Sequence, residues 1–416
     1  MSQFALPRWP VFEADELAAV DAVLRSGNVN YWTSRECHDF EAAWSSAHGG
    51  RRSISMANGS LTLDVAMRAL EIGPGDEVIV SPRSYVASAM CVVLAGAKPI
   101  FADVDPISGC INHETAEAVR SPRTRAVIPV HVGGWPCDMP KLLDWAQGHG
   151  IRVIEDCAQA HGGHIDGRPL GTFGAIASWS FCQDKIVTTG GEGGMLSTDE
   201  GELYERCWSL SQHGKERLDA TRTIKDGDAG RFRWLVTREG TNLRMTSMQA
   251  AIGIRQLGKL PEWSEARRRN AGIMQDALRT IANIEVPPTP PGHAHYRCTA
   301  FTSGEDAAPL RDELIASLRE SGLAASTGSC GEVYREKLFQ SRGFSPAHAG
   351  RGAVDDQGRL RVARQLADTS LAFLVHHTID RSTMQDYAGL VRDCIVRTIA
   401  GRGPSGRTCG RNSPCD

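Results

Sequence analysis

Hydrophobic residues recur along this chain with two different spacings, and each spacing predicts a different kind of element. Near the N-terminus, Leu17, Val20 and Leu24 fall on one face of a helix that ends at Gly27. Further on, short apolar runs rich in β-branched residues alternate with stretches of helical spacing. The runs predict strands at residues 77–81, 126–131, 152–156, 176–181 and 194–198. The stretches between them predict helices at 61–71, 85–96 and 139–149.

Strands that alternate with helices indicate βα units, which build a mainly parallel sheet with helices on both faces. We therefore predict an α/β fold for the N-terminal part of the chain. After Thr246 the helical spacing continues past Pro261 and predicts a long connecting helix. We expect a large domain at residues 1–260 and a smaller C-terminal α+β domain at 261–400. The Gly-, Arg-, Ser- and Pro-rich residues 401–416 are interpreted as a disordered tail.

Composition narrows the class of protein. Of 416 residues, 46 are Lys or Arg and 49 are Asp or Glu, so the formal charge is −3. This balance lacks the basic excess typical of a nucleic-acid binder. Hydrophobic residues make up 41% of the chain, which is enough for a large packed core. These values favour a globular enzyme.

The N-terminal segment and the cysteines favour the cytoplasm. The first residues lack the basic and apolar regions of a signal peptide. The longest mostly apolar stretch, Ala87–Ala97, is shorter than the ~18–20 residues that cross a bilayer. The 12 cysteines include no C-x-x-C pair, so we interpret them as free thiols. We expect neither a membrane association nor a metal site.

Candidate chemistry lies at or just beyond the predicted strand ends, where open parallel sheets bind ligands. The first candidate is the turn after Asn58, where Gly59 and Ser60 start a helix. Free backbone N–H groups and the positive end of the helix dipole make such a start a phosphate site. Taken alone, an ordinary helix cap at Ser60 explains these residues better.

The second candidate is Asp156, which ends an apolar strand. Its carboxylate is expected to be partly desolvated and to need a cationic partner. A protonated pyridine nitrogen would serve, because each charge would stabilise the other and the ring would become a better electron acceptor. A structural salt bridge or a helix cap is the alternative, and for this residue by itself the better one.

The third candidate is the segment after the strand at 176–181, where Lys185 precedes a glycine-rich turn and Ser180 lies five residues upstream. A lysine beside a buried cofactor can give up its proton and form an imine with an aldehyde. The hydroxyl of Ser180 can contact a phosphate. A solvated surface lysine and a simple hairpin turn are the alternatives.

The fourth candidate is Tyr85, which follows the strand at 77–81 and can lie over a planar ring, although a core or rim aromatic is the alternative. None of the four candidates is decisive alone, but their order along the chain is specific. Pyridoxal phosphate requires each of these parts: a phosphate cup, a stacking face, an anion at the ring nitrogen and a lysine for the aldehyde. The absence of a G-x-G-x-x-G motif after the first strand argues against a dinucleotide site.

With these residues in place, the sequence resembles the DegT/StrS family of sugar aminotransferases, a group of pyridoxal-phosphate enzymes of fold type I. The resemblance runs from Trp32 to Leu260 and more thinly to about residue 395. The matching stretches are FEAAWSSAHG, NGSLTLDVAMRALEIGPGDEVIV, LAGAKPIFADVD, TRAVIPVHVGG, VIEDCAQAHGG, SFCQDKIVTTGGEGG and NLRMTSMQAAIG.

The resemblance implies a role for each matching position. Lys185 matches the lysine that binds the aldehyde, Asp156 the pyridine-nitrogen partner, and Gln159 the residue near the ring hydroxyl. Tyr85 occupies the stacking position. The phosphate contacts match Gly59, Ser60 and Ser180, and a further one from the partner subunit matches Asn242. The family is dimeric with active sites at the subunit interface, so a homodimer is implied.

The implied activity is transamination from an amino donor, by resemblance glutamate, to a keto sugar. The expected acceptor is a nucleotide-linked 4-keto-6-deoxyhexose, and the product an amino sugar for polysaccharides or secondary metabolites. Residues 327–337 and 373–380, where sugar contacts are expected, match the family loosely, and Leu243 stands where the family often has Tyr. The acceptor therefore stays open.

Two alternatives to this activity remain. One is an aminotransferase of a keto-cyclitol such as an inosose. The other is a non-catalytic regulatory or sensor protein, against which the retained Lys185 counts. A basic stretch with Lys215, Arg231 and Arg233 either meets a diphosphate or forms a solvated loop. His131 and His161 flank the site, but we assign no histidine a catalytic role.

Overall fold

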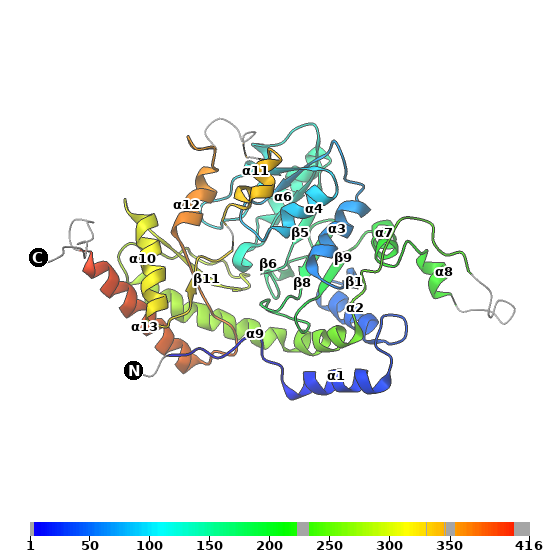
Figure 1. Ribbon diagram of the computed structural model, residues 1–416, viewed down its shortest axis with the longest axis horizontal. Coiled ribbons are helices and arrows are strands. Elements are labelled where there is room, and N and C mark those ends of the chain that lie inside the picture. The colour runs from blue at the N-terminus through cyan, green and yellow to red at the C-terminus, as the bar shows by residue number, and fades with distance from the viewer. Residues whose placement is uncertain (1–3, 223–232, 330, 345, 347–353, 403–416) are drawn as a thin grey trace, which may run out of the picture.

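A seven-stranded sheet forms the centre of the larger part of the molecule (Figure 1). The computed structural model describes residues 4–222, 233–329, 331–344, 346 and 354–402. The strand order is β1-β9-β8-β5-β4-β2-β3. The bounds are β1 Arg52–Met56, β2 Glu77–Val80, β3 Lys98–Phe101, β4 Thr124–Ile128, β5 Arg152–Asp156, β8 Ile176–Ser180 and β9 Gly194–Thr198.

All strands of this sheet run in one direction except β9. The pairs from β3 through β2, β4 and β5 to β8 are parallel, whereas β9 is antiparallel to both of its neighbours, β8 and β1. The predicted mainly parallel α/β sheet is therefore confirmed. Because β1 and β8 are both antiparallel to β9, they point the same way. The carboxyl ends of the other six strands therefore lie at the same edge of the sheet.

The five predicted strands correspond to β2, β4, β5, β8 and β9. The strand predicted at 126–131 is too long, because β4 ends at Ile128 and only Val130 bridges onward, to Asp156. Two strands of this sheet, β1 and β3, were not predicted. In β1, serines alternate with Ile54 and Met56, and β3 contains Pro99, which an edge strand tolerates because one side of its backbone has no sheet partner.

Helices cover both faces of the sheet. Neighbouring residues of β9 show this: Met195 packs in a core with Phe40 and Trp44, whereas Leu196 packs in the main core with Leu63. The helices of this part are α1 Ala14–Ser26, α2 Glu36–Ala47, α3 Gly59–Ala69, α4 Ala87–Leu94, α5 His113–Glu117, α6 Met139–His149, α7 Gly201–Ser211 and α8 Arg217–Thr221. A short 3₁₀ turn at Val132–Gly134 and the two-residue strands β6 His164–Ile165 and β7 Arg168–Pro169 complete it.

Helix α1 forms where predicted and ends at Gly27 in a left-handed conformation, but its buried face is not the predicted one. Leu17 and Leu24 are 61% and 57% exposed. The inward side chains are Val23 and Glu16, because α1 packs on α9 (Ser247–Arg279). There Lys259 binds the acidic start of α1, with its Nζ 3.1 Å from Glu16.

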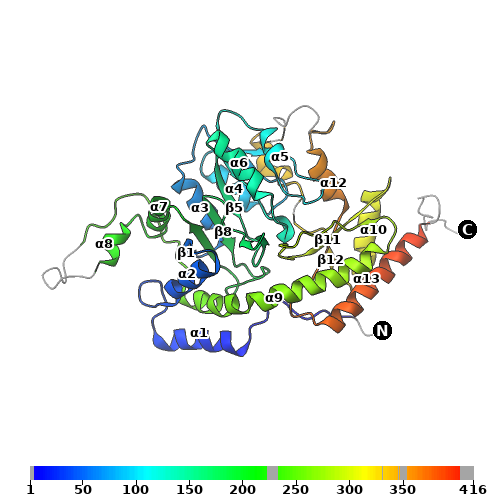
Figure 2. The same cartoon turned by 180° about the vertical axis from the view of Figure 1, so that it is seen from behind.

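A smaller region holds most of the remaining elements (Figure 2). Its four-stranded antiparallel sheet has the order β10-β11-β13-β12, and its own core includes Leu314, Phe373 and Tyr387. The bounds are β10 Ile284–Glu285, β11 Cys298–Thr302, β12 Ala325–Ser326, β13 Ser370–Phe373, α10 Ala307–Glu320, the 3₁₀ turn Val333–Arg335, α11 Lys337–Ser341, α12 Arg361–Thr369 and α13 Arg381–Gly401. The 3₁₀ turn, α11 and α12 also contribute Val333, Phe339 and Ala363 to the core of the large sheet.

Helix α9 continues unbroken through Pro261 and links the two regions. Its contacts include α1 and α2 on one side and α13 and β11 on the other. The predicted boundary at residue 260 therefore lies inside a helix, and the division into two domains stays a prediction. The predicted tail begins too early, because α13 extends to Gly401; residues 403–416 lie outside the described part.

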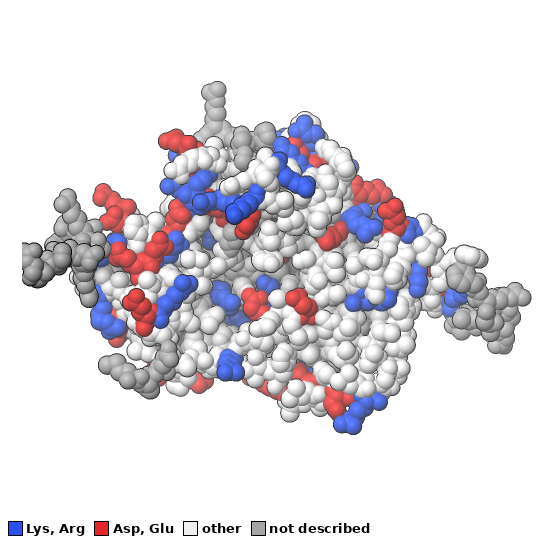
Figure 3. Space-filling model, viewed as in Figure 1, with Lys and Arg blue, Asp and Glu red and all other residues white. Residues whose placement is uncertain are grey.

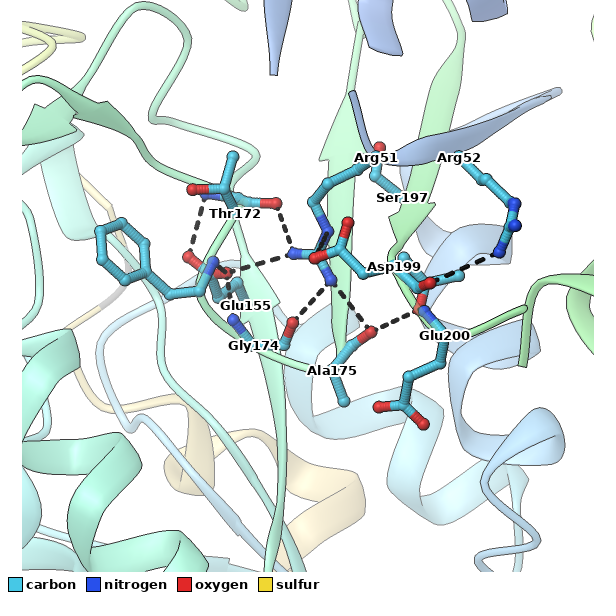
Figure 4. Close-up of polar contacts among 12 residues, drawn as sticks. Arg51, Arg52, Glu155, Thr172, Gly174, Ala175, Ser197, Asp199 and Glu200 are labelled. Atoms are coloured by element: carbon cyan, nitrogen blue, oxygen red, sulfur yellow. Dashed lines mark hydrogen bonds and ion pairs between the residues drawn. The ribbon is translucent and has the colours of Figure 1, made fainter. Parts of the chain in front are cut away.

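A buried ion pair ties the residue before β1 to β5 and to the residue after β9 (Figure 4). The Arg51 guanidinium lies between Glu155 and Asp199, at 3.9 Å and 3.2 Å respectively. Neither the Arg51 nor the Glu155 side chain is more than 3% exposed. The Glu155 carboxylate also accepts backbone N–H bonds from Gly171, Phe173 and Gly174, at 2.9, 2.7 and 2.6 Å.

We expect Glu155→Gln to destabilise the protein by about 3 kcal/mol at pH 7, because it leaves Arg51 buried with less compensating charge. Burial opposes ionisation of Glu155, but His131, the Gly174 N–H and Arg51 together hold its pKa below the ordinary value. A carboxyl with a lowered folded-state pKa stabilises above its unfolded pKa, and this contribution is lost as pH falls through the folded value. The free energy of unfolding, measured with denaturant, should thus differ between wild type and Glu155→Gln by a constant amount above about pH 5 and by less below it. A difference that grows in acid would contradict this role of Glu155.

Candidate active site

Four strand ends bring the predicted residues to one edge of the sheet. Gly59 follows β1, Tyr85 follows β2, Asp156 ends β5 and Ser180 ends β8. Because these strands run in the same direction, their carboxyl ends share the edge at which open α/β sheets bind ligands. In the register of β5 and β8, Asp156 lies opposite Ser178, two residues from Ser180. The tertiary structure thus gathers residues that are more than 100 positions apart.

The first turn of α3 forms a cradle against β8. The helix cap is Asn58, whose side chain accepts the Leu61 N–H at 3.0 Å, so the alternative of a cap at Ser60 is wrong. Gly59 and the exposed Ser60 are the first helical residues, whose N–H groups have no partner within the helix. A Cβ atom on Gly59 would lie 2.6 Å from the Ser180 Cβ. Glycine is therefore required for helix and strand to approach this closely.

Replacing Gly59 by alanine should weaken binding of a phosphate-bearing ligand by at least about tenfold, because α3 and β8 must separate. The new methyl group would also lie 2.9 Å from the Ser180 Cα atom, which cannot rotate away. A titration of pyridoxal phosphate onto the two proteins measures the change. The matched control is Gly258→Ala in α9, where an added Cβ meets nothing within 4 Å. Equal losses in both variants would contradict the cradle.

Asp156 is a buried carboxylate whose side-chain partners carry no charge. It is 4% exposed. Its Oδ2 accepts the Ser88 hydroxyl at 2.6 Å and its Oδ1 the Ala158 N–H at 3.1 Å. Among the residues that the structure describes, these are its only side-chain partners, so the structural salt bridge considered from the sequence is not formed there. A ligand cation at this carboxylate would meet a group with which no cation of the described residues pairs.

Gln159 is held in one orientation by its carbonyl oxygen. This Oε1 accepts the Gly133 N–H at 2.7 Å and the Ser329 hydroxyl at 3.3 Å. Because both partners donate, the accepting atom is the oxygen, and the amide NH₂ is left to donate elsewhere. Ser329 belongs to the loosely matching stretch 327–337, which the structure thereby brings beside the predicted cofactor residues.

Lys185 lies in the loop between β8 and β9, and its side chain is 13% exposed. Its Nζ lies 3.7 Å from Asp184 and 5.1 Å from the centre of the Tyr296 ring. Its carbonyl oxygen accepts the Trp9 indole N–H at 3.0 Å. Sequence reasoning missed Trp9 and Tyr296, because each is more than 100 residues away from Lys185 and no local pattern marks it.

The hydroxyl of Tyr296 donates a hydrogen bond to the Asp184 carboxylate. Tyr296, which precedes β11, therefore holds the carboxylate beside Lys185 in place. Burial opposes ionisation of this carboxyl, but Lys185, the Tyr296 hydroxyl and Arg297 hold the pKa of Asp184 below its ordinary value. The Arg297 guanidinium lies 4.4 Å from the centre of the Tyr296 ring. These contacts surround the lysine with an ordered set of polar and aromatic groups.

Tyr85 and Asn242 are exposed in one protomer. Tyr85 precedes α4 and is 70% exposed. Asn242 lies on the surface beside Gln212, to which it is joined by a β-bridge. Leu243, the departure noted in the sequence, is 8% exposed and packs in the main core. Of the basic stretch, Arg231 lies outside the described residues.

The flanking histidines have structural surroundings. His131 Nδ1 accepts the Cys137 N–H at 3.0 Å, and its Nε2 lies 3.4 Å from Glu155. His161 lies between aromatic rings, Trp179 at 5.3 Å among them, and burial holds its pKa well below the ordinary value. Cys157 joins His131 and Glu155 in a buried cluster, but burial raises the pKa of this thiol, which therefore stays protonated and is a poor metal ligand.

Solved proteins show the same architecture. An aminotransferase structure from Psychrobacter cryohalolentis matches with a TM-score of 0.88 and 39% identity, covering 95% of this chain and all of that one. The fold is that of the fold type I class of pyridoxal-phosphate transferases, as predicted. The model of the DegT/DnrJ/EryC1/StrS aminotransferase family matches residues 10–355. The chain belongs to this family of aminotransferases.

Two relatives extend the comparison. GDP-perosamine synthase from Caulobacter vibrioides is 36% identical over 364 residues, which cover 87% of this chain and 88% of that protein. L-glutamine:2-deoxy-scyllo-inosose aminotransferase from Streptomyces kanamyceticus is 35% identical over 404 residues, which cover 92% of each. The relatives thus include both acceptor classes considered from the sequence.

The surface and the helices add two observations. Basic and acidic side chains are interspersed on the face drawn in Figure 3, as the near-neutral composition predicts. Among the described helices, none combines the length and the apolar character that a membrane span requires.

Proposed function

We propose that this protein binds pyridoxal 5′-phosphate at the carboxyl edge of the sheet and uses it to transfer an amino group. The observation that carries the proposal is Asp156, a buried carboxylate whose described partners are uncharged, placed across the edge from a glycine cradle. The residues fit the group: Gly59, Ser60 and Ser180 would hold its phosphate, and Asp156 its pyridine nitrogen. Gln159 would donate to the ring hydroxyl, Tyr85 would stack on the ring, and Asn242 would reach a phosphate in the partner subunit.

Pyridoxal phosphate supplies an aldehyde and a ring that accepts an electron pair. Lys185 supplies the amine that holds the cofactor and, when free, the general base that removes a proton from the α-carbon of the amino donor. Asp156 keeps a proton on the ring nitrogen by ion pairing. The low exposure of Lys185 and Asp156 limits water at both positions and strengthens these interactions.

The proposed donor is glutamate and the proposed acceptor a nucleotide-linked keto sugar, foremost a 4-keto-6-deoxyhexose. Similarity to GDP-perosamine synthase over most of both chains supports a nucleotide sugar. The similarity to an inosose aminotransferase favours a keto-cyclitol as the second candidate. The retained Lys185, together with the buried Asp156 whose described partners are uncharged, supports an enzyme over a non-catalytic sensor.

A homodimer is part of the proposal. Large apolar side chains, among them Leu17, Leu24 and Trp32, are exposed on one protomer, and a second copy would bury such surface. Asn242 is exposed and free to reach a second site. We assign the protein to the cytoplasm, because the nine cysteines of its described part are free thiols.

The test is the absorbance spectrum of the purified protein with pyridoxal phosphate, before and after excess glutamate. We expect a visible band that glutamate bleaches, because the amino group passes to the cofactor. The bleached protein is then offered a nucleotide-linked keto sugar or a free keto-cyclitol, and the acceptor that restores the band identifies the second substrate. A protein that shows no band overturns the proposal.

A further inference from the structure

A chain of buried hydroxyl groups leads to the Asp156 carboxylate. The Ser84 and Ser88 hydroxyl oxygens lie 2.7 Å apart, and the Ser88 oxygen lies 2.6 Å from Asp156 Oδ2. The three residues are 2%, 1% and 4% exposed. No function described above uses either serine.

The number of hydroxyl hydrogens decides which group donates in each of these two hydrogen bonds. A carboxylate only accepts, and a serine has a single hydroxyl hydrogen, so Ser88 donates to Asp156. The lone pairs of Ser88 are then available, and Ser84 donates to Ser88. The Tyr85 carbonyl, 3.4 Å from the Ser88 hydroxyl, is a much weaker competitor. Each hydroxyl polarises the next, which strengthens the last bond, the one to Asp156.

The backbone of Asp156 is anchored independently of the serines. Its N–H donates to the Pro129 carbonyl at 2.9 Å, and its carbonyl accepts the His131 N–H at 3.2 Å. The carboxylate therefore keeps its position at the end of β5 without Ser88. What Ser88 adds is a hydrogen bond to the charge itself and a fixed rotation of the carboxylate plane.

Two buried thiols and the carboxyl of Asp64 belong to the electrostatic surroundings of this carboxylate. Burial raises the pKa of the Cys91 thiol and of the Cys157 thiol, and the Asp156 charge raises both further. Burial also raises the pKa of Asp64, which interacts with Cys91. The Ser88 hydroxyl and the Ala158 N–H are thus the donors by which the described protein stabilises the Asp156 charge.

We propose that Ser88 is a positioning residue that holds the Asp156 carboxylate as an anion toward the pyridine nitrogen of the cofactor, with Ser84 as its supporting donor. The proposal rests on the proposed function, because it requires that nitrogen to face Asp156. Without the Ser88 hydroxyl the Asp156 carboxylate loses the shorter of its two hydrogen bonds. With the cofactor bound, a proton between this carboxylate and the ring nitrogen would then lie closer to the carboxylate, and the ring would carry less positive charge.

The loss of ring charge has a spectroscopic consequence. A positive ring nitrogen disfavours a second positive charge at the nitrogen that joins Lys185 to the cofactor. When the ring charge falls, that second nitrogen holds its proton to higher pH. The pKa of the visible band of the loaded protein therefore reports on Ser88, whereas a purely structural serine would leave it unchanged.

The experiment compares absorbance titrations of the wild type, Ser88→Ala, Ser88→Thr and Ser84→Ala, each loaded with pyridoxal phosphate. In Ser88→Ala we expect the band pKa to rise by about one unit and cofactor affinity to fall about tenfold, as for the loss of a hydrogen bond to a charged group. Ser88→Thr retains the hydroxyl and should titrate as wild type. Ser84→Ala should raise the band pKa as well, by a smaller amount than Ser88→Ala.

Ser197→Ala is the matched control, since this buried hydroxyl bonds Ser53 at 3.0 Å and does not contact Asp156. Ser197→Ala should lower the stability of the protein without changing the pKa of the visible band. The role of Ser88 alone is overturned if the wild type shows the band and Ser88→Ala leaves its pKa unchanged. It is also overturned if Ser197→Ala shifts the band pKa by the same amount as Ser88→Ala. A wild type without any band overturns the proposed function and the role of Ser88 together. If Ser88→Ala does not fold, Ser88→Cys, a weak donor, gives the same comparison.

Discussion

Replacing Lys185 by alanine is expected to lower the rate of amino transfer by at least about 10⁴-fold, because one side chain serves as both cofactor anchor and general base. The variant should also lack the visible band of the lysine-bound cofactor. It should still bind pyridoxal phosphate without a covalent bond, since the Gly59 cradle and the Asp156 carboxylate are unchanged. Single-turnover rates and a dialysis assay for bound cofactor measure these two effects separately.

Lys141 offers a matched control, because its side chain is 66% exposed on α6 and pairs only with Asp138 in the described part of the chain. Lys141→Ala should keep both the band and the rate. A small added amine that partly restores turnover in Lys185→Ala would identify proton removal as the missing function. Undiminished turnover in Lys185→Ala would contradict the assignment.

The second large effect is expected for Asp156→Asn, which keeps the shape of the side chain and removes its charge. The rate should fall by about 10² to 10³-fold, because the ring nitrogen loses the anion that keeps it protonated. Cofactor affinity should fall less, since the phosphate contacts and Lys185 remain. The measurements are kcat for transamination and the cofactor dissociation constant.

The control for this variant is Asp166→Asn, in the exposed turn between β6 and β7. Asp166 has φ of 49°, a left-handed conformation that asparagine also tolerates, so the turn should persist. Its rate and spectrum should equal those of the wild type. If Asp156→Asn behaves like this control, Asp156 does not pair with the cofactor.

Most of the large sheet was predictable from local pattern, because a strand buried on both faces has a continuous apolar run. β2 has such a run, and β5, β8 and β9 have shorter apolar stretches among polar residues; all four lie where predicted. β1 and β3 were missed, since polar Ser53 and Ser55 and the edge-strand Pro99 break the pattern that local analysis detects. The inward face of α1 was predicted wrongly, because its partner α9 offers Lys259 to an acidic face rather than an apolar groove to Leu17 and Leu24.

Tyr85, Asp156 and Ser180 could be proposed from sequence because each ends or follows a predicted strand, and parallel strands share one edge. The helix start at Gly59 was proposed from its turn, and Gln159 from the family resemblance. Their surroundings could not be proposed in the same way. The Ser88 bond to Asp156 spans 68 residues, the Ser329 bond to Gln159 spans 170 and the Trp9 bond to Lys185 spans 176. No periodicity or short motif encodes a contact over such separations.

The sequence by itself thus determined the class of fold, the alternation of strands and helices, and the order of the chemical groups along the chain, since all three depend on local spacing and residue type. Only the tertiary structure decided which partners those groups have. It left Asp156 with uncharged partners in the described protein, pressed Gly59 against Ser180 and oriented Gln159. Burial and close approach depend on how distant elements pack, and that packing sets the electrostatics from which the chemistry of the site follows.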